Sequence, residues 1–435
     1  IAPPTLHSST TSTTATSGVT AVDTDALLPP IIAAGASMDS KRRAEEALTI
    51  GLASLSTPLR PIVVLVHGEP REFLGQVPIL SLVQRRLEMR GIDLIEWACV
   101  VNPSPTRLAQ IDPNGKRPVV YLIMSADSAS GSAQPQNPQT SNPALTGVAR
   151  NEKIGATLAK LIEDGEQILV SLNPSVVPSY GGVDPIVKPL AEFGVTAESG
   201  RPLLRESQIA STPGARVVET DQAVLVREAQ VAAHPLSSAL RGLPVAFAWP
   251  ITLSPLARDE GPRVSFTPIL TIEPESSTWL ESQWLKLWQT PRDQRALLSD
   301  LPRFDPSRDI NTPLIKAQGW IVASASERIS PVTDKPQRAV VIGTNSWLID
   351  QVVGRQVNID GRQVSAYPGN LELLDACVSY LAFQDDLIAQ SAAAQPISLI
   401  APIEPSRLLA LRMAIILGLP ILILLLGGAM LYLRR

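Results

Sequence analysis

The clearest chemical candidate in this chain is the turn His67-Gly68-Glu69-Pro70, which follows the apolar run PIVVLV at 61–66. A buried parallel strand carries the residues after it to the carboxyl edge of its sheet, where doubly wound folds bind ligands. His67 and Glu69 are therefore candidates for an acid–base pair or for two ligand contacts. The alternative is a structural turn in which His67 caps neighbouring carbonyls and Gly68 adopts a positive φ. Because no nucleophile stands nearby in sequence, the turn is the favoured interpretation.

Three further polar groups have types that could bind or react, and each has a simpler interpretation. Gly343-Thr344-Asn345 follows another apolar strand and could cradle an anion, although a plain turn is favoured. His234-Pro235 could contact a ligand or form a strand-exit turn. Asp385-Asp386 resembles a metal site only in composition, since no third ligand is near, and a solvated helix end is favoured.

A Trp-rich segment contains Trp279, Trp284 and Trp288. Trp284 and Trp288 are four residues apart, so they would share one face of a helix. The cluster could be a platform for a sugar or a protein partner, and core packing is the favoured alternative.

Composition and missing motifs exclude several classes of function. The chain has no G-x-x-x-x-G-K-[ST] phosphate loop and no G-x-S-x-G elbow. Its three histidines have no zinc spacing, and a net charge of −4 leaves no basic stripe for nucleic acid. Cys99 and Cys377 lie in apolar segments, so buried free thiols are favoured over a disulfide. We expect no cofactor, no metal and no catalysis.

Hydrophobic periodicity predicts the elements that would position these residues. Apolar runs predict strands at 61–66, 92–101, 118–124, 168–172 and 338–343, and amphipathic patterns predict helices at 77–90, 148–164 and 370–383. Strands that alternate with amphipathic helices indicate a doubly wound, mostly parallel α/β sheet.

The pattern also divides the chain into segments. We expect a disordered Ser/Thr-rich tail at 1–38, an α/β domain at 39–200, a β-richer part at 201–335, an α/β closing segment at 336–404 and a transmembrane helix at 408–433. Residues 125–146 are a polar insert and are predicted to form a surface loop.

The transmembrane prediction depends on the uncharged stretch Met413–Leu433, which as a helix would be roughly 32 Å long and match a bilayer core. Pro420 is tolerated in membrane helices when neighbours satisfy the freed carbonyl. Residues typical of interfacial anchors lie at or next to its ends: Arg412, Tyr432, Arg434 and Arg435. The sequence therefore predicts a protein held in a membrane by its C-terminus.

The order of several segments is similar to that of a known family. A helix carrying Glu45-Glu46-Ala47-Leu48 leads into the strand Val63–Val66 and the turn His67-Gly68-Glu69. Further matching segments are LVQRRLEMRGIDLIEW at 82–97, KLIEDGEQILVSLNPS at 160–175, PLAEFGV at 189–195, His234-Pro235, VVIGTNSWL at 340–348, Gly369–Leu373 and Asp385–Ile388. Together they resemble the gliding-motility-type ABC transporter auxiliary protein family (the GldG-like family).

This resemblance implies a subunit that works outside the cytoplasm of a bacterium, anchored in the inner membrane beside an ABC permease and an ATPase. It also implies a core similar to the class I glutamine-amidotransferase fold, without that fold's catalytic Cys–His pair. The expected role is binding and coupling. Two alternatives stay open: a stand-alone membrane-anchored surface or adhesion protein, and a membrane-anchored hydrolase that uses His67 and Glu69.

Overall fold

The structure is a computed structural model that describes residues 59–75, 79–130, 146–208, 216–225, 234–256, 264–291, 294–295, 301–315, 318–359 and 362–388. The expected N-terminal tail, the helix around Glu45-Glu46, most of the 125–146 insert and the predicted transmembrane helix lie outside these residues.

The described part alternates strands and helices along its first third and is richer in strands afterwards. The strands are β1 (Ile62–His67), β2 (Asp93–Ala98), β3 (Val119–Met124), β4 (Gln167–Ser171), β5 (Val195–Ala197), β6 (Leu203–Gln208), β7 (Arg216–Glu219), β8 (Asp221–Leu225), β9 (Pro244–Ala248), β10 (Leu253–Pro255), β11 (Ser265–Ile272), β12 (Thr278–Leu280), β13 (Trp320–Ile329), β14 (Pro336–Ile342), β15 (Gln356–Ile359) and β16 (Arg362–Ser365). The α-helices are α3 (Ser81–Met89), α4 (Leu108–Ile111), α5 (Gly147–Glu163), α6 (Val187–Leu190), α7 (Pro235–Ala239), α8 (Leu285–Gln289), α9 (Asp350–Val353) and α10 (Gly369–Leu381). Short 3-10 turns are η2 (Val177–Tyr180), η3 (Ala191–Phe193), η7 (Ser346–Leu348) and η8 (Asp385–Leu387).

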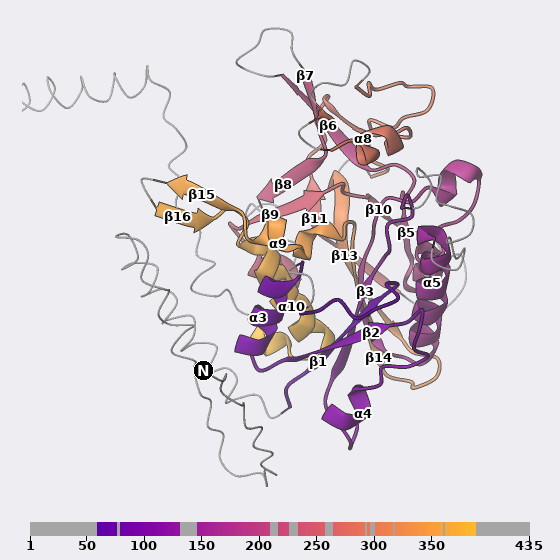
Figure 1. Ribbon diagram of the computed structural model, residues 1–435, viewed down its shortest axis with the longest axis vertical. Helices are drawn as coiled ribbons and strands as arrows, with labels where there is room; N and C mark the ends of the chain where they lie inside the picture. Colours follow the sequence, from indigo (N-terminus) through magenta and orange to yellow (C-terminus); the bar gives the residue numbers. More distant parts are fainter. Residues whose placement is uncertain are drawn as a thin grey trace, which may run out of the picture. The chain divides into compact units, whose positions relative to one another are not determined.

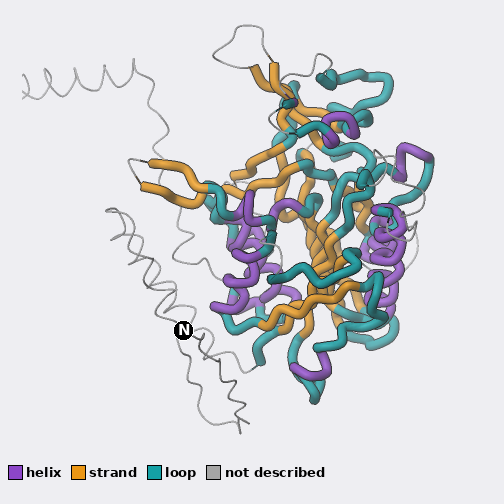
Figure 2. The backbone as a smooth tube through the Cα atoms, in the orientation of Figure 1, coloured by secondary structure: helices purple, strands orange, loops and turns teal. Residues whose placement is uncertain are grey.

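A seven-stranded sheet in the order β11-β13-β14-β4-β3-β1-β2 forms the centre of the fold (Figures 1 and 2). The five strands from β14 to β2 are parallel, and β13 and β11 extend the sheet in antiparallel pairing. The predicted α/β class with a mostly parallel sheet is therefore confirmed.

Helices cover both faces of this sheet, because its central strands are apolar on both sides. On one face, α3 and α10 pack against Val63 and Leu65 of β1. On the other face, α5 and α6 pack against Ile62, Val64 and Val66. Figure 1 shows α5 on the side of the sheet opposite α3 and α10. Each of these fully buried aliphatic side chains contributes about 1.5–3 kcal/mol of transfer free energy.

Local signals account for the ends of these helices. Thr146 caps α5 by accepting a hydrogen bond from the Ala149 amide, as expected for an N-cap threonine. Asp184 accepts bonds from the Ile186 and Val187 amides and starts α6. The chain after α3 turns at Gly91, which has a φ of +66° that favours glycine.

Four small sheets lie beside the seven-stranded one: three are formed by strands between β5 and β12, and one is a hairpin after β14. These are β10-β5, β12-β6-β7, β8-β9 and the hairpin β15-β16. In Figure 1 the β15-β16 hairpin stands away from the central sheet, and each of its strands pairs only with the other. The β-rich character expected for 201–335 is present, and two of its strands belong to the same sheet as β1.

Candidate functional site at the carboxyl edge of the sheet

The turn after β1 lies where the strand order reverses. The chain passes from β1 to β2 on one side, and β3 then pairs with β1 on the other side. In open α/β sheets the crevice outside the carboxyl ends of two such strands is the usual ligand site. Here the ends of β1 and β3 are His67 and Met124, so the predicted turn lies at this point.

His67 is buried, with only 3% of its surface exposed. Its Nδ1 accepts a hydrogen bond of 3.1 Å from the Glu69 amide, which assigns the proton of the neutral ring to Nε2. Nε2 lies 3.0 Å from Oε1 of Glu96, a close polar contact that does not have hydrogen-bond geometry. Burial lowers the pKa of His67 to about 4. The imidazole is therefore neutral at pH 7.

Glu96, on β2, connects His67 to the following loop. One carboxylate oxygen accepts a hydrogen bond from the Phe73 amide, and the other accepts one of 3.1 Å from the Leu74 amide. Burial raises the pKa of Glu96, and the two hydrogen bonds from the backbone amides oppose that rise. The ring of Phe73 closes over His67, with 4.7 Å between the ring centroids. Glu96 thus holds the loop that covers the imidazole.

Glu69 does not pair with the His67 side chain. Its carboxylate, half exposed, forms an ion pair with Arg150 of α5. Arg150 also donates a hydrogen bond of 2.9 Å to the Ser130 hydroxyl, so it connects the loops after β1 and β3. The acid–base pair considered for His67 and Glu69 is therefore not assembled in this structure.

The structural interpretation of the turn also needs correction. His67 accepts a hydrogen bond from the Glu69 backbone amide and does not cap carbonyl groups. Gly68 is not among the described glycines with positive φ. It is needed for close packing, because a Cβ there would lie 3.0 Å from both Arg150 Cβ and Ile154 Cδ1. The turn is pressed against α5.

The hydroxyl and thiol groups nearest in the chain are engaged elsewhere. Ser125 and Ser128, after β3, donate hydrogen bonds to the carbonyls of Ser171 and Pro174. Cys99 donates to the backbone carbonyl of His67, and burial raises the pKa of its thiol. Among the described residues, no hydroxyl or thiol bonds a ring nitrogen of His67. The arrangement holds the loops and contains no activated nucleophile at that imidazole.

The Gly343-Thr344-Asn345 segment follows β14 at the same edge. Gly343 leaves no room for a side chain, since a Cβ would lie 2.0 Å from the Ile251 carbonyl oxygen. Thr344 donates to the Ala248 carbonyl, and Asn345 Nδ2 donates to the Ser125 carbonyl. Asn345 Oδ1 is buried without a partner among the described residues. The segment therefore joins β9, β3 and β14, and it offers one free acceptor.

The Trp cluster contacts the loop that follows β3. Trp284 is buried and Trp288 half-buried, with 5.6 Å between their ring centroids. Both also meet Trp249, whose φ is +54°, unusual for a bulky residue. Trp288 Nε1 lies 3.4 Å from Asp127 Oδ2, in the loop after β3. Core packing is confirmed for Trp284, whereas Trp288 reaches the surface.

The other candidates are separate from this edge. His234 is the N-cap of α7, where its Nδ1 accepts from the Leu236 amide, and Pro235 is the first helical residue. Asp385 forms a two-bond ion pair with Arg338. Cys99 and Cys377 are free thiols, as favoured; Cys377 is buried as expected, whereas Cys99 is only half-buried. The described residues contain no cluster of side chains with the composition of a metal site.

Sequence reasoning missed Glu96 and Arg150, the two charged partners at this site. Glu96 is the only acid inside the apolar run 94–99, and that position could have marked it. Arg150 had no local signal, because its contact with Glu69 spans 81 residues.

The proposed anchor residues Arg412, Pro420, Tyr432, Arg434 and Arg435 lie outside the described residues. Within the part of the chain that the structure describes, none of the helices is long and apolar enough to cross a bilayer. Comparisons with family models, curated proteins and solved structures find no match to this chain.

Proposed function

We propose that this chain is a non-catalytic, membrane-anchored auxiliary subunit of an ABC transporter complex of the gliding-motility type. Its α/β region would bind a component outside the cytoplasm of a bacterium. The stretch 408–433 would anchor the chain in the inner membrane and pack on the permease. The role assigned is binding and coupling, with ATP hydrolysis left to a separate subunit.

One observation supports a binding role: the polar side chains at the carboxyl edge of the sheet hold loops in place. Glu96 holds the loop 73–74, His67 contacts the Phe73 ring, and Arg150 holds the loops after β1 and β3. None of these three side chains meets an activated nucleophile among the described residues. A buried neutral histidine in such a frame supports a rigid surface. This favours binding over the hydrolase alternative.

The finer fold assignment belongs to the same proposal. The parallel part of the sheet has the order β2-β1-β3-β4-β14, with helices on both faces. This is the flavodoxin-like doubly wound order. It is compatible with the class I glutamine-amidotransferase-like core that the sequence resemblance implies.

Affinity purification of the full chain in mild detergent, followed by mass spectrometry, tests the proposal. Recovery of a multi-span permease with a P-loop ATPase is the expected result. The matched control replaces Met413–Leu433 with an unrelated single-span helix of equal length, which keeps the anchor and should lose the permease. If the native chain is recovered alone, or only with cell-surface polymers, the transporter assignment is wrong.

A second experiment addresses hydrolysis directly. The variant His67→Ala/Glu69→Ala should leave unchanged any hydrolytic activity that co-purifies with the protein. Loss of that activity, with thermal stability preserved, would overturn the non-catalytic assignment.

A further inference from the structure

The described α/β region begins and ends at the amino edge of the central sheet, which is the edge opposite the candidate site. Leu59 comes just before β1, and Gln384 follows the last turn of α10. The Gln384 side-chain amide donates a hydrogen bond of 2.9 Å to the Leu59 carbonyl. The chain therefore enters and leaves this region side by side, at one edge of the sheet.

The segment after α10 is held where it leaves the sheet. Arg338, near the start of β14, donates hydrogen bonds of 2.7 and 3.0 Å to the two carboxylate oxygens of Asp385, and one of 2.7 Å to the Tyr380 carbonyl. Its guanidinium group also lies over the rings of Tyr380 and Phe383, 4.2 and 4.5 Å from their centroids. A two-bond pair between arginine and a carboxylate fixes geometry as well as charge. The chain that follows Ile388 thus starts from a fixed point on the amino edge.

Large apolar side chains are exposed along this edge. Val332, in the turn between β13 and β14, is 70% exposed, and Ile329 at the end of β13 is 49% exposed. Phe383 is 47% exposed and Leu59 is 43% exposed. Apolar exposure of this kind marks contacts with lipid or with other proteins. The carboxyl edge also exposes apolar side chains, Val101 among them, so exposure alone does not choose between the two edges.

The sequence that follows the exit favours lipid at the amino edge. It contains no charged residue from Leu387 to Ile403, and the uncharged stretch Met413–Leu433 of the proposed anchor comes after it. An anchor connected to this exit brings the amino edge toward the bilayer, because the exit lies on that edge. Exposed apolar side chains there gain transfer free energy when they enter the boundary between headgroups and acyl chains.

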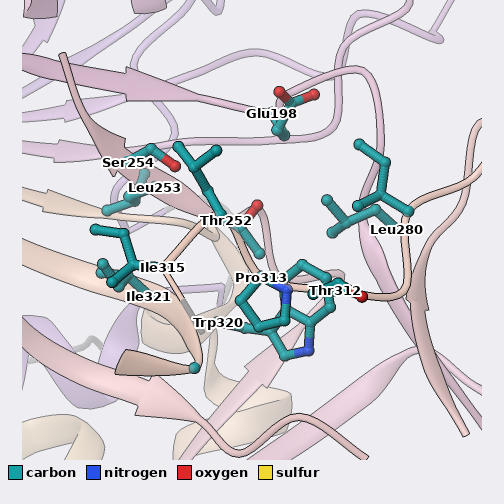
Figure 3. A pocket seen from close by; sticks show the side chains of 13 residues that line it. Glu198, Thr252, Leu253, Ser254, Leu280, Thr312, Pro313, Ile315, Trp320 and Ile321 are labelled. Atoms are coloured by element: carbon teal, nitrogen blue, oxygen red, sulfur yellow. The ribbon is translucent and has the colours of Figure 1, made fainter. Parts of the chain in front are cut away.

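An apolar cavity of about 120 Å³ lies at the other end of β13 (Figure 3). The first residues of β13, Trp320 and Ile321, belong to its lining. The turn with Val332 follows the last residue of the same strand. The cavity is therefore separate from the exposed apolar side chains of the amino edge, and it lies toward the same end of the sheet as His67.

We propose that the amino edge of the central sheet is the face of this region that contacts a lipid bilayer, and that the fixed exit at Arg338 and Asp385 keeps it there. Val332, Ile329 and Phe383 enter the boundary between headgroups and acyl chains, while the site at His67 faces away from the membrane. The inference rests on the membrane anchor of the proposed function and adds which face of the α/β region meets the lipid.

The test measures how closely two labelled positions approach lipid acyl chains. The full chain with Cys99→Ser, which leaves only the buried Cys377, is reconstituted into phosphatidylcholine vesicles that contain a nitroxide-labelled phosphatidylcholine. A bimane label is attached through Val332→Cys or through Val101→Cys. The two valines are a matched pair, because both are exposed and each follows a strand, β13 at one edge and β2 at the other. We expect the nitroxide to quench the label at position 332 and to leave the label at position 101 bright.

A second pair of variants tests the fixed exit. Gln384→Ala/Asp385→Asn removes the bond to Leu59 and the ion pair with Arg338, so quenching at position 332 should fall toward that at position 101. Asp386→Asn makes the same change of charge at the next residue, which is exposed, and should keep the native difference. Near-ultraviolet circular dichroism shows whether each variant is folded.

Flotation of the vesicles separates this inference from the proposed function. If the chain does not float with the vesicles, it lacks the anchor, and both proposals are wrong. If it floats and the two labels are quenched equally, or the label at position 101 is quenched more, this inference alone is wrong. A folded Gln384→Ala/Asp385→Asn variant with the native difference would contradict the role assigned to the fixed exit.

Discussion

Asn151 and Ala126 exchange two hydrogen bonds across the carboxyl edge of the sheet. The Ala126 amide donates to Asn151 Oδ1 at 2.7 Å, and Asn151 Nδ2 donates to the Ala126 carbonyl at 3.0 Å. Asn370 forms the same pair of hydrogen bonds with Ala246: the Ala246 amide donates to Asn370 Oδ1 at 2.9 Å, and Asn370 Nδ2 donates to the Ala246 carbonyl at 3.0 Å. Two buried asparagines near the N-termini of α5 and α10 thus each satisfy the backbone amide and carbonyl of one residue, Ala126 after β3 and Ala246 on β9.

Replacing Asn370 with Ala should destabilise the protein by about 2–4 kcal/mol, because an amide and a carbonyl of Ala246 lose their partners. Asn370→Asp should also be destabilising at pH 7, since a carboxylate cannot donate to the Ala246 carbonyl. The free energy of unfolding in urea measures both effects. A loss under about 0.5 kcal/mol for the alanine variant would contradict the role assigned to this amide.

Acid should weaken the fold through His67. Its pKa is about 4 when folded and about 6.5 in an unfolded chain, so the unfolded chain binds the proton more tightly. Stability should therefore fall as the pH drops from 6.5 to 4, by at most about 3 kcal/mol. Glu96 acts in the opposite sense, because burial raises its pKa.

The variant His67→Gln isolates this contribution, since glutamine stays neutral and Glu96 is retained. Its free energy of unfolding should change less between pH 7 and pH 4.5 than that of the native chain. Burial also lowers the pKa of His234, at the start of α7, so His234→Gln should reduce the native dependence as well, but by less than His67→Gln. Equal pH slopes for His67→Gln and the native chain would show that His67 is not the titrating group.

Gly68→Ala should cost about 1–3 kcal/mol because the new methyl group would press on Arg150 and Ile154. Ile154→Val removes the Cδ1 atom that the new Cβ would meet. The double variant should therefore lose less stability than the sum of the two single losses. Simple additivity in chemical unfolding would indicate that the turn after β1 has room for a side chain.

Replacing the tryptophans of the cluster with alanine should cost more stability for the more deeply buried residue. Trp284→Ala should cost about 3–5 kcal/mol, as expected for a large aromatic residue removed from a core. Trp288→Ala should cost less, because Trp288 is only half-buried. Thermal unfolding of the two variants measures the order, and the reverse order would contradict the packing described here.

The regular part of the fold follows from short-range sequence patterns. The strands β1, β3, β4 and β14 are apolar on both faces, so their runs stand out without any knowledge of their neighbours. β13 was missed because Ser324 and Ser326 interrupt its apolar pattern, although both are buried. β14, its partner on one side, follows it directly in the chain, whereas β11, its partner on the other side, ends at Ile272, and no local pattern reveals that distant pairing.

The candidate site was only partly predictable for the same reason. The position of His67 after a buried strand indicated the correct edge of the sheet. Its actual side-chain partner, Glu96, comes from the next strand, and Glu69 turned instead to Arg150 on α5. These pairings depend on how the loops pack, so residue types and spacing along the chain do not determine them.

The insertion of β14 between β4 and β13 affects how the chain is made. β4 ends at Ser171, and the strand that pairs with its outer edge begins at Pro336. At ordinary rates of translation, β4 waits roughly ten to thirty seconds for that partner to emerge from the ribosome. During synthesis its open edge must be shielded by chaperones or by the emerging chain itself, and a product truncated before β14 would keep that edge exposed.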